Sequence, residues 1–531
     1  MSARRARSLA LALPEVARDG SGSVEVVAPA RRARHRERPL PARLWLAIEL
    51  PRLALEAHHR RDPTAPPMAV GDGRGRRPRV VAANDQALAA GVEPGMALAT
   101  ASALVPALRM LGRDSAVESA ALADLGAWCE QFSSLVSLEP PDVVLVEIGA
   151  SLRLLGGLGP LRRAVEAGVE GLGLTARTAV APTPSSAVLL ARAGIREPVT
   201  DPNALAARLA PVPVECLGLP ADAVQMLRAV GADRLADCLR LPRDGLARRV
   251  GPAVLALLDR ALGRHPDPRE PHRAPEVFER ALTWPDAISD LERVLHGARC
   301  LLEELAGFLR GRDAGARAVE VLLAHRGLPA TRVVLGLTAP SRDPVHLLGL
   351  LAARLERVEL VHPVEQLGMR VVDLAPLAPT ATDLFAAPGG SVRPDGGAAD
   401  GWPRLVERLR ARLEARAVHG LAITADHRPE RAWRARGDAE PARPHPSVPA
   451  PPRRPLWLLE IPRPLVVTAG VPRHRGPLAL IEGPERIETG WWDGEDVRRD
   501  YYLAGNPRGE RFWIYRERDG ERGWYLHGVF G

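Results

Sequence analysis

The chain has 531 residues, 46% of them hydrophobic, and it carries a formal net charge of +8 with an isoelectric point near 10.1. One hydrophobic core does not hold this length, so we expect about three or four domains. No apolar run reaches the ~18 residues of a membrane helix, which argues against a membrane-spanning protein.

Composition also indicates the partner class and the compartment. All 72 cationic residues are arginine against 64 acidic ones, and the positive excess favours a polyanionic partner such as DNA. The short apolar stretch at residues 9–13 lacks a cleavage site, so we expect a cytoplasmic protein. Four widely spaced cysteines, without a CxxC pair or a histidine at ligand spacing, predict reduced thiols rather than disulfides or a zinc site.

The first part of the chain reads as a basic arm followed by an α/β or α+β region. Residues 1–43 are polar, basic and aperiodic, and we predict that they are disordered. From Leu44 to about Ile195, apolar segments with strand character alternate with helical ones. The predicted strands are 44–50, 79–83, 143–148 and 176–181, and the predicted helices are 115–132, 158–172 and 184–193.

Short helices punctuated by glycine and proline follow over residues 203–263. Within them, residues 227–263 resemble paired helix-hairpin-helix units, in which backbone N–H groups at helix N-termini contact DNA phosphates without reading sequence. An ordinary small helical domain is the alternative that this segment leaves open. A linker rich in proline, histidine and arginine then spans 264–276.

A small α+β module is predicted next. Its first helix lies at about 287–312, where apolar residues recur at helical spacing. The further elements are strands at 317–327, 331–340 and 366–374 and a helix at 344–358. Residues 376–455 are rich in Pro, Gly, Asp and Arg and predict a flexible linker with one amphipathic helix at 402–418.

The last region, residues 456–531, differs in composition. All four tyrosines and four of the ten tryptophans follow residue 490. Alternation in 511–518 and 523–530, joined by Asp-Gly, predicts a β-hairpin. The aromatic side chains are expected to build a compact core, a binding surface or both.

Taken in order, these segments resemble the Y-family (lesion-bypass, UmuC/DinB-like) DNA polymerases over roughly residues 44–375. The resemblance implies an α+β multidomain fold arranged like a right hand, with a small C-terminal β-rich aromatic module added. The implied domains are a palm at 44–200 with fingers inserted at about 57–107, a helix-hairpin-helix thumb at 201–263, a linker at 264–276, a little-finger-like DNA-binding domain at 277–375, a flexible linker at 376–455 and the β-rich module at 456–531.

The motifs that hold catalytic metal in this family are degenerate here. The family's first strand carries a metal-binding aspartate, then an aromatic steric gate, then a Ser-Val-Glu ending. Glu56 fits the ending, but the aspartate position is Ala47 and the gate position is Arg52. The family's second metal motif, an Asp-Glu pair, falls on Pro141 and Asp142.

Residues that bind the incoming nucleotide in the family differ as well. The Tyr and Arg that contact its triphosphate fall on Asp85 and Leu88, although the glycine turn that follows is kept. A later Asn-Lys…Ala-Lys motif resembles residues 180–188, where Thr183, Pro184 and Val188 replace its polar residues.

These losses bear directly on the chemistry. Phosphoryl transfer needs carboxylates that fix magnesium between the attacking 3′ oxygen and the leaving phosphate. Neither Ala47 nor Pro141 offers an oxygen ligand, so we predict no catalytic residue, no metal and no cofactor. The alternative left open is a residual translesion polymerase with a substitute site of relocated carboxylates. The candidates for that site are Glu49, Glu139, Asp142 and Glu147.

The pattern resembles a polymerase-like branch of this family that has lost catalytic residues. That branch implies a scaffold in DNA-damage-induced (SOS) translesion synthesis and mutagenesis, acting on damaged or primer-template DNA. The implied partners are the DNA sliding clamp, an error-prone C-family DNA polymerase and a RecA-like accessory protein. A DNA-binding module without clamp or polymerase partners is the other alternative.

A clamp-binding peptide is expected after the little finger. Asp383, Leu384 and Phe385 match the end of the family's Gln-Leu-(Ser/Asp)-Leu-Phe peptide, while Ala381 and Thr382 replace its start. An exposed Leu-Phe pair in a linker is explained by docking into an apolar pocket. The alternative is a chance apolar pair that packs on its own domain.

DNA contacts are expected from the thumb's backbone amides and from arginines. Such contacts would be phosphate-directed, tolerant of sequence and steeply dependent on salt. The candidate arginines are Arg248, Arg249, Arg317, Arg326 and Arg332.

Overall fold

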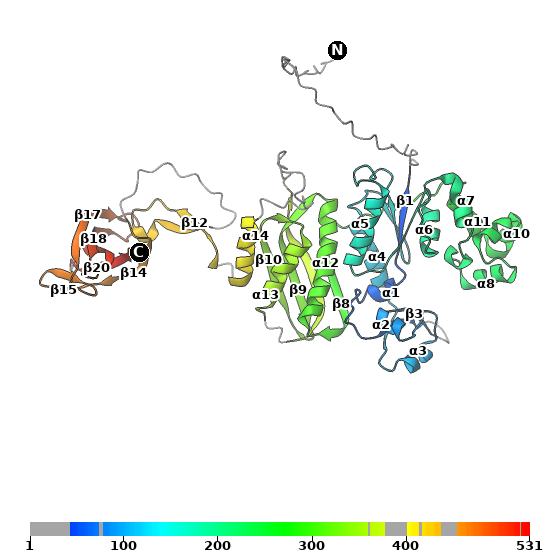
Figure 1. Cartoon of the computed structure of the whole chain (residues 1–531), viewed down its shortest axis with the longest axis horizontal. Helices are drawn as coiled ribbons and strands as arrows, with labels where there is room; N and C mark the ends of the chain where they lie inside the picture. Colours follow the sequence, from blue (N-terminus) through cyan, green and yellow to red (C-terminus); the bar gives the residue numbers. More distant parts are fainter. Residues whose placement is uncertain are drawn as a thin grey trace, which may run out of the picture.

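The structure, a computed structural model of the chain, describes residues 43–73, 78–358, 362–377, 401–413, 417–436, 454–520 and 522–531. The folded regions are arranged along one long axis, in an order that differs from chain order (Figure 1). Helices of the predicted thumb occupy one end and the C-terminal β-rich region occupies the other. No helix among the described residues is long and apolar enough to cross a bilayer.

The first described strand belongs to a four-stranded antiparallel sheet in the order β5-β6-β1-β7, here called the palm-like sheet. Its strands are β1 (Trp45–Glu49), β5 (Val136–Glu139), β6 (Val143–Glu147) and β7 (Arg177–Ala181). On one face lies α6 (Pro184–Arg192), and on the other lie α4 (Ser115–Cys129) and α5 (Leu158–Gly171). Burial on both faces explains why β1 is an unbroken apolar run.

A smaller sheet in the order β3-β2-β4 is inserted between β1 and α4, with β2 parallel to β4. The inserted elements are α1 (Leu53–Glu56), β2 (Met68–Asp72), β3 (Arg79–Ala83), α2 (Asp85–Ala89), α3 (Leu98–Leu104) and β4 (Arg109–Gly112). Asn84 fixes the start of α2, because its Oδ1 accepts hydrogen bonds from the N–H groups of Ala87 and Met68, both at 3.0 Å. This side chain ties the helix to the neighbouring strand.

Short helices follow α6 and pack on the same face of the palm-like sheet. They are α7 (Leu205–Leu209), α8 (Ala221–Ala229), α9 (Leu235–Arg240), α10 (Arg243–Val250) and α11 (Pro252–Ala261). Gly231 lies between α8 and α9, and Gly251 lies between α10 and α11, with φ of +77° and +97°. Glycine adopts such angles without steric cost, so each pair of helices can turn tightly. Their apolar sides merge with the core beneath α6.

A second four-stranded antiparallel sheet has the order β10-β9-β11-β8. Its region contains β8 (Glu279–Ile288), α12 (Leu291–Gly311), β9 (Ala314–His325), β10 (Leu328–Ser341), α13 (Pro344–Leu355), β11 (Val364–Pro376) and α14 (Gly401–Leu413). One core joins the sheet to α12 and α13, and Ala411 of α14 belongs to it. The buried Glu407 of α14 accepts a hydrogen bond from the Thr338 N–H and lies 2.6 Å from His346 Nε2. Thus α14 packs on this region rather than standing apart.

This region docks on the palm-like part through α12. The indole of Trp128 on α4 lies against α12 and α5, where Gly307 and Gly168 leave room for it. A Cβ at either glycine would overlap the ring. Cys300 of α12 packs against Gly173, where a Cβ would lie 3.1 Å from the thiol sulfur. The fit therefore depends on small residues along both helices.

Charged side chains are buried at the same interface. Arg280 Nε lies 2.7 Å from Asp124 Oδ1 and 3.1 Å from Glu304 Oε1, and Arg60 Nη2 lies 3.5 Å from Glu304 Oε2. Burial, with added repulsion from Glu304, raises the pKa of Asp124 to about 7, although Arg280 opposes the shift. Asp124 is therefore a carboxyl that titrates near neutral pH inside the docked interface.

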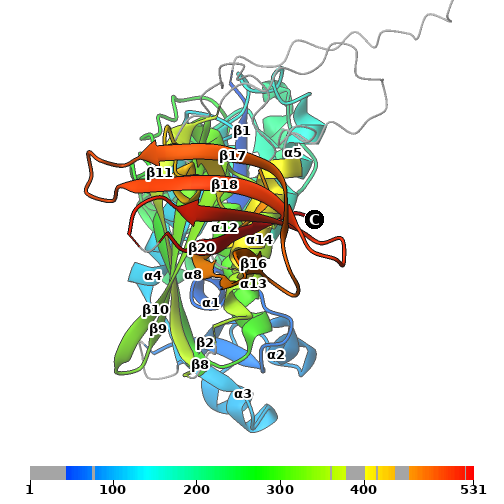
Figure 2. The same cartoon turned by 90° about the vertical axis from the view of Figure 1, so that its left-hand side faces the viewer.

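The C-terminal region holds a five-stranded antiparallel sheet in the order β14-β20-β19-β18-β17, whose strands run across the view in Figure 2. Its strands are β14 (Trp457–Pro464), β17 (Ala479–Thr489), β18 (Val497–Gly505), β19 (Arg511–Glu517) and β20 (Trp524–Val529), with a hairpin of β15 (Val466–Thr468) and β16 (Val471–Arg473). Tyr501, Trp513 and Tyr515 are buried on one face, and the Tyr501 and Trp513 rings stack at 4.1 Å. Trp491 and Trp492 are exposed, so the aromatic residues supply both core and surface.

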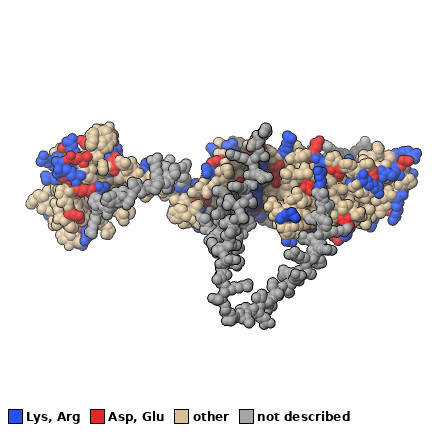
Figure 3. Space-filling model, turned by 90° about the horizontal axis from the view of Figure 1, so that it is seen from above, with Lys and Arg blue, Asp and Glu red and all other residues tan. Residues whose placement is uncertain are grey.

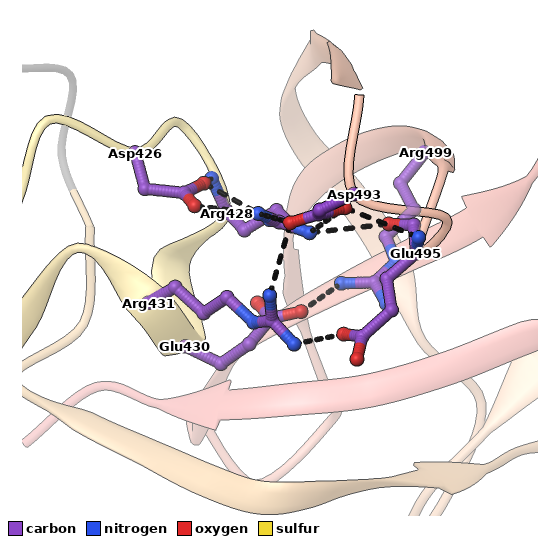
Figure 4. Close-up of polar contacts among 7 residues, drawn as sticks. All are labelled: Asp426, Arg428, Glu430, Arg431, Asp493, Glu495 and Arg499. Atoms are coloured by element: carbon purple, nitrogen blue, oxygen red, sulfur yellow. Dashed lines mark hydrogen bonds and ion pairs between the residues drawn. The ribbon is translucent and has the colours of Figure 1, made fainter. Parts of the chain in front are cut away.

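A second hairpin lies against this sheet through ion pairs. It consists of β12 (Gly420–Ile423) and β13 (Trp433–Arg436), with a 3-10 turn (Pro429–Arg431) between them. Arg428 donates hydrogen bonds to Asp426 at 2.7 Å and to Asp493 at 2.6 Å, and Arg499 of β18 donates to Glu430 at 2.8 Å (Figure 4). The residues predicted to form a linker at 376–455 thus include α14 and this hairpin.

Candidate functional site

The position at which the family has its first metal-binding aspartate lies in the middle of the palm-like sheet. Here it is Ala47, which has no carboxylate. Ala47 pairs with Leu145 of β6 and with Ala179 of β7, and it is completely buried. It belongs to the core on the α6 face of the sheet. Alanine here contributes packing and offers no oxygen to a metal ion.

Two carboxylates lie near this position, and an arginine pairs with each. Glu49 is the cross-strand partner of Arg177, whose Nη1 lies 3.6 Å from Glu49 Oε2. Asp142 accepts a hydrogen bond from Arg192 at 3.1 Å, and its backbone oxygen accepts one from Leu50 at 2.8 Å. Burial raises the pKa of Glu49, Arg177 opposes this, and the neighbouring Asp142 adds to it. The two carboxyl groups are thus close enough to interact.

Glu49, Asp142, Arg177 and Arg192 form what we call the charge-balanced cluster. Its two carboxylates are offset by two guanidinium groups, whereas magnesium needs carboxylate oxygens that are free to face the ion. Nowhere in the described part of the chain do three or more His, Cys, Asp or Glu side chains gather as a metal site requires. The cluster is suited to joining β1 to β7, and the β5–β6 turn to α6, through ion pairs.

The remaining carboxylates of the proposed substitute site have structural partners. Glu147 Oε1 accepts hydrogen bonds from the N–H groups of Leu44 at 3.2 Å and Gly149 at 3.0 Å. Glu139 pairs with Arg269, which follows α11 in the chain. Pro141 lies in the turn between β5 and β6 and presents no ligand. These contacts give both glutamates a role in holding the sheet and its surroundings.

An ion pair joins the two positions at which the resemblance places the steric gate and the triphosphate-binding tyrosine. Arg52 donates a hydrogen bond to Asp85 at 2.6 Å, and Arg61 donates to the same carboxylate at 3.3 Å. The hydrogen bond from Arg52 is the main reason that the pKa of Asp85 is lowered, so this carboxylate is ionised at neutral pH. Asp85 therefore holds both arginines in ion pairs at the place where the family has a tyrosine that contacts the triphosphate.

The other replaced nucleotide-binding residues serve the fold. Leu88 packs in the small core beside β2 and β3. Thr183 Oγ1 accepts a hydrogen bond from Ser186 N at 3.2 Å, which caps α6, and Pro184 occupies the first turn of that helix. Val188 is buried in the core on the same face. A helix cap, a helix start and two packing contacts stand where the family has polar groups.

Cationic side chains gather at the thumb-like end and on the C-terminal region in the view of Figure 3. Arg248 and Arg249 are exposed at the end of α10, and Arg317 is exposed on β9. Arg326 pairs with Glu365 at 2.8 Å. Arg332 pairs with a buried glutamate described next. The five predicted DNA contacts are therefore divided between two regions, and two of them already have acidic partners.

The outer face of the second sheet contains an ion-pair group that the sequence did not suggest. Glu320 of β9 is 1% exposed and pairs with both Arg332 of β10 and Arg370 of β11. Val334 and Val372 are exposed on neighbouring strands. The arginines on this face are thus partly neutralised, and part of the face is apolar. The predicted clamp-binding residues Asp383, Leu384 and Phe385 lie outside the described residues.

Comparison with known proteins decides the family. The sequence pattern of the impB/mucB/samB family matches residues 53–192. Two curated proteins named Protein ImuB, from Caulobacter vibrioides strains NA1000 / CB15N and ATCC 19089 / CB 15, are each 31% identical over 468 residues, which cover 83% of this chain and 100% of the relative. The chain belongs to the ImuB family. The degenerate motifs had indicated this branch of the Y-family, and that prediction is confirmed.

Solved structures similar to this ImuB-family chain include a chimera of the Y-family DNA polymerases Dbh and Dpo4, with a TM-score of 0.36 and 17% identity over 62% of this chain and 98% of the other. DinB from Sulfolobus solfataricus gives 0.35 and 16% over 63% and 100%. The family and the observed elements confirm the α+β multidomain, Y-family-like class with an added β-rich C-terminal region. The chain is a UmuC-like polymerase homologue of a family concerned with mutagenesis.

Sequence reasoning about this ImuB-family member missed the arginines of the charge-balanced cluster. Arg177 and Arg192 are far from Glu49 and Asp142 in the chain, so no local motif links them. One signal was available, because antiparallel pairing of the predicted first and last strands of the palm places Arg177 opposite Glu49. The approach of Glu49 to Asp142 was anticipated from the sequence, but its neutralisation by arginine was not.

Proposed function

We propose that this chain is a non-catalytic polymerase homologue that acts as an adaptor in DNA-damage-induced translesion synthesis and mutagenesis. In this role it binds primer-template DNA and the sliding clamp, and it recruits an error-prone C-family DNA polymerase and the RecA-like accessory protein ImuA. The observation that carries the proposal is the charge-balanced cluster beside the buried Ala47, in the place of a metal centre.

The electrostatics favour this reading over a residual polymerase. A divalent ion between Glu49 and Asp142 would have to displace Arg177 and Arg192 or lie beside them, and like charges at such short range repel strongly. The Arg52–Asp85 pair supports the same reading, because it ties a guanidinium to a carboxylate at the place where the family binds a triphosphate. On this proposal, neither requirement of phosphoryl transfer is met.

Primer extension with magnesium or manganese tests the loss of catalysis. We expect no nucleotide incorporation above background by the purified chain. Incorporation that disappears in Glu49→Ala and in Asp142→Ala, but persists in the matched control Glu93→Ala at an exposed carboxylate, would establish the residual polymerase instead. Contamination by another polymerase would leave the activity of all three variants unchanged.

The clamp contact is tested by pull-down with the purified sliding clamp. We expect Leu384→Ala/Phe385→Ala to reduce clamp retention at least tenfold, since a Leu-Phe pair is the anchor of such peptides. The matched control is Val372→Ala/Leu374→Ala, which removes two exposed apolar side chains from β11 and should leave retention unchanged. Equal retention by both double variants would show that the chain does not bind the clamp through this peptide.

DNA binding by the thumb-like helices is supported by the two glycine-turned hairpins and by the exposed pair Arg248 and Arg249. Contacts of this kind are phosphate-directed, so Arg248→Gln/Arg249→Gln should lower the slope of log affinity against log salt by up to about 1.8 for duplex DNA. An unchanged slope would show that these arginines of α10 do not contact the DNA.

A further inference from the structure

An open hollow of about 1160 Å³ lies on the C-terminal region, on the side of the sheet away from the Tyr501 stack. We call it the arginine hollow. The side chains that give it its chemical character are Arg463, His474, Arg475, Arg508, Arg511 and Phe512. They come from the end of β14, the turn after β16, and the β18–β19 turn with the start of β19, so the sheet gathers three separate segments around one surface.

The β18–β19 turn is held in a fixed shape. Asn506 Oδ1 accepts hydrogen bonds from the N–H groups of Arg508 at 3.0 Å and Glu510 at 3.1 Å, and Asn506 Nδ2 donates to Glu510 at 2.6 Å. Arg508 therefore lies at a defined tip of the turn. The N–H of Phe530 donates to the carbonyl of Arg511 at 3.0 Å, which joins the residues after β20 to the start of β19.

Cationic side chains outnumber acidic ones in the arginine hollow. Glu510 is the acidic side chain among its lining residues, and Arg475 already donates to it at 3.1 Å. Within the described part of the chain, the side chains of Arg463, Arg508 and Arg511 have no ion pair or hydrogen bond. Elsewhere on the same sheet, Arg486, Arg498 and Arg518 each pair with a carboxylate. The hollow therefore gathers on one surface three arginines that have no carboxylate partner among the described residues.

Aromatic and apolar groups line the same surface. His474 contacts Phe512 edge-on at 5.0 Å, and burial and the nearby Arg475 lower its pKa, so it is a neutral ring at pH 7. His474 is half-buried and lines the hollow, whereas the side chain of Phe530 packs toward the Tyr501 face of the sheet. Arg475 has a φ of +52°, an unfavourable backbone conformation for arginine that is kept at this surface.

We propose that the arginine hollow binds a segment of single-stranded nucleic acid. Guanidinium groups match phosphates in bidentate geometry, and cations on three segments suit a row of phosphates better than one carboxylate. The half-buried ring of His474, which lies against Phe512, offers a stacking surface for a base, and stacking accepts any base, so binding tolerates sequence. This site is additional to the DNA contacts of the thumb-like helices, and it does not depend on the adaptor role or on clamp binding.

The test uses the full chain and a fluorescent oligothymidylate of about 15 nucleotides, within the size range that such surfaces cover. The variant Arg508→Gln/Arg511→Gln is compared with Arg498→Gln/Arg518→Gln, which removes equal charge outside the hollow. We expect the first to weaken binding about fivefold or more and to lower the salt slope by about 1.4, and the second to change affinity less than about twofold. Equal weakening in both variants, or none in the first, overturns the proposal.

Two further measurements keep the site distinct from the thumb. His474→Leu keeps apolar bulk but loses the ring, and it should weaken binding about fivefold, since stacking on an aromatic side chain contributes at least that much per base. Wild-type protein crosslinked to 5-iodouracil-substituted strands should carry adducts at His474. Absence of adducts there overturns the site even if other regions bind DNA. Displacement of an acidic peptide, with no crosslink to nucleic acid, would assign the hollow to a protein ligand and would likewise overturn the proposal.

Discussion

Replacing Asp124 with asparagine should make the docking of α12 on α4 independent of pH. In the wild type, the folded pKa of Asp124 is raised to about 7 from the usual 3.8 of an aspartate. The docked state therefore holds this proton more tightly than an open state in which Asp124 meets water. Docking is strongest below about pH 4, weakens as the pH rises from 3.8 to about 7, and is constant above that.

The size of the effect follows from the shift. A difference of about three pKa units corresponds to about 4 kcal/mol. As the pH rises from about 5.5 to 8, docking loses roughly 2 kcal/mol of this free energy, which is about a thirtyfold change in the opening equilibrium. Asparagine cannot ionise, so Asp124→Asn should lose this dependence and should open less often than the wild type at pH 8.

Cys300 provides a readout for opening, since it is buried on α12 against Gly173. The rate of its reaction with a pyridyl disulfide, followed by mass spectrometry of the labelled peptide, reports the open population. The ratio of wild-type to Asp124→Asn rates at each pH cancels the intrinsic chemistry of the thiol. We expect this ratio to rise about thirtyfold from about pH 5.5 to 8, whereas the same ratio at the half-buried Cys216 should stay constant. A flat ratio at Cys300 would refute the buried-carboxyl account of this interface.

Three further outcomes are expected. Glu56→Ala should lower the free energy of unfolding by about 2–4 kcal/mol in urea titrations, because buried Glu56 accepts two 2.6 Å hydrogen bonds from Thr175, and a loss under ~1 kcal/mol would contradict this. Manganese in excess over chelator should leave the melting temperature unchanged, since arginine already pairs with Asp142, and a rise of several degrees that Arg192→Ala enhances would point to a metal site. Arg428→Gln should speed trypsin cleavage within residues 417–436, while Arg486→Gln, outside this contact, serves as the control that should not.

Elements with regular apolar periodicity were predicted well from the sequence. The strand at 79–83 has the predicted bounds, and helices predicted at 115–132, 158–172 and 184–193 are found at 115–129, 158–171 and 184–192. These segments owe their structure to local pattern, which a single sequence displays. Differences of a few residues at helix ends reflect fraying and caps rather than a different fold.

Several strands were missed, for different reasons. Both β8 and β17 contain a proline, at positions 285 and 484, and both are edge strands of their sheets. Proline has no N–H to donate, so it is tolerated where one side of the strand has no partner. The strand β2 was missed as well, although it pairs antiparallel with the nearby β3; its other partner, β4, is parallel and lies about 40 residues later.

The candidate site was predicted from what the sequence lacks more than from what it contains. The side chains of Ala47 and Pro141 exclude metal ligation in any conformation, so that prediction needed no coordinates. The Arg52–Asp85 pair and the charge-balanced cluster depend on chain segments that meet only after folding. A sequence can therefore predict that a ligand is absent, whereas the group that lies in its place is visible only in three dimensions.

The indole of Trp128 between Gly168 and Gly307 has a mechanical consequence. Because one rigid ring touches helices from both regions, the palm-like sheet and the second sheet keep a fixed separation and angle that no linker could impose. The packing around Trp128 therefore sets the distance between the palm-like sheet and the second sheet. Two molecules held by the thumb-like helices and by the second sheet would be spaced by the thickness of this packed body, so the distance between them would be set by side-chain volume at one tryptophan.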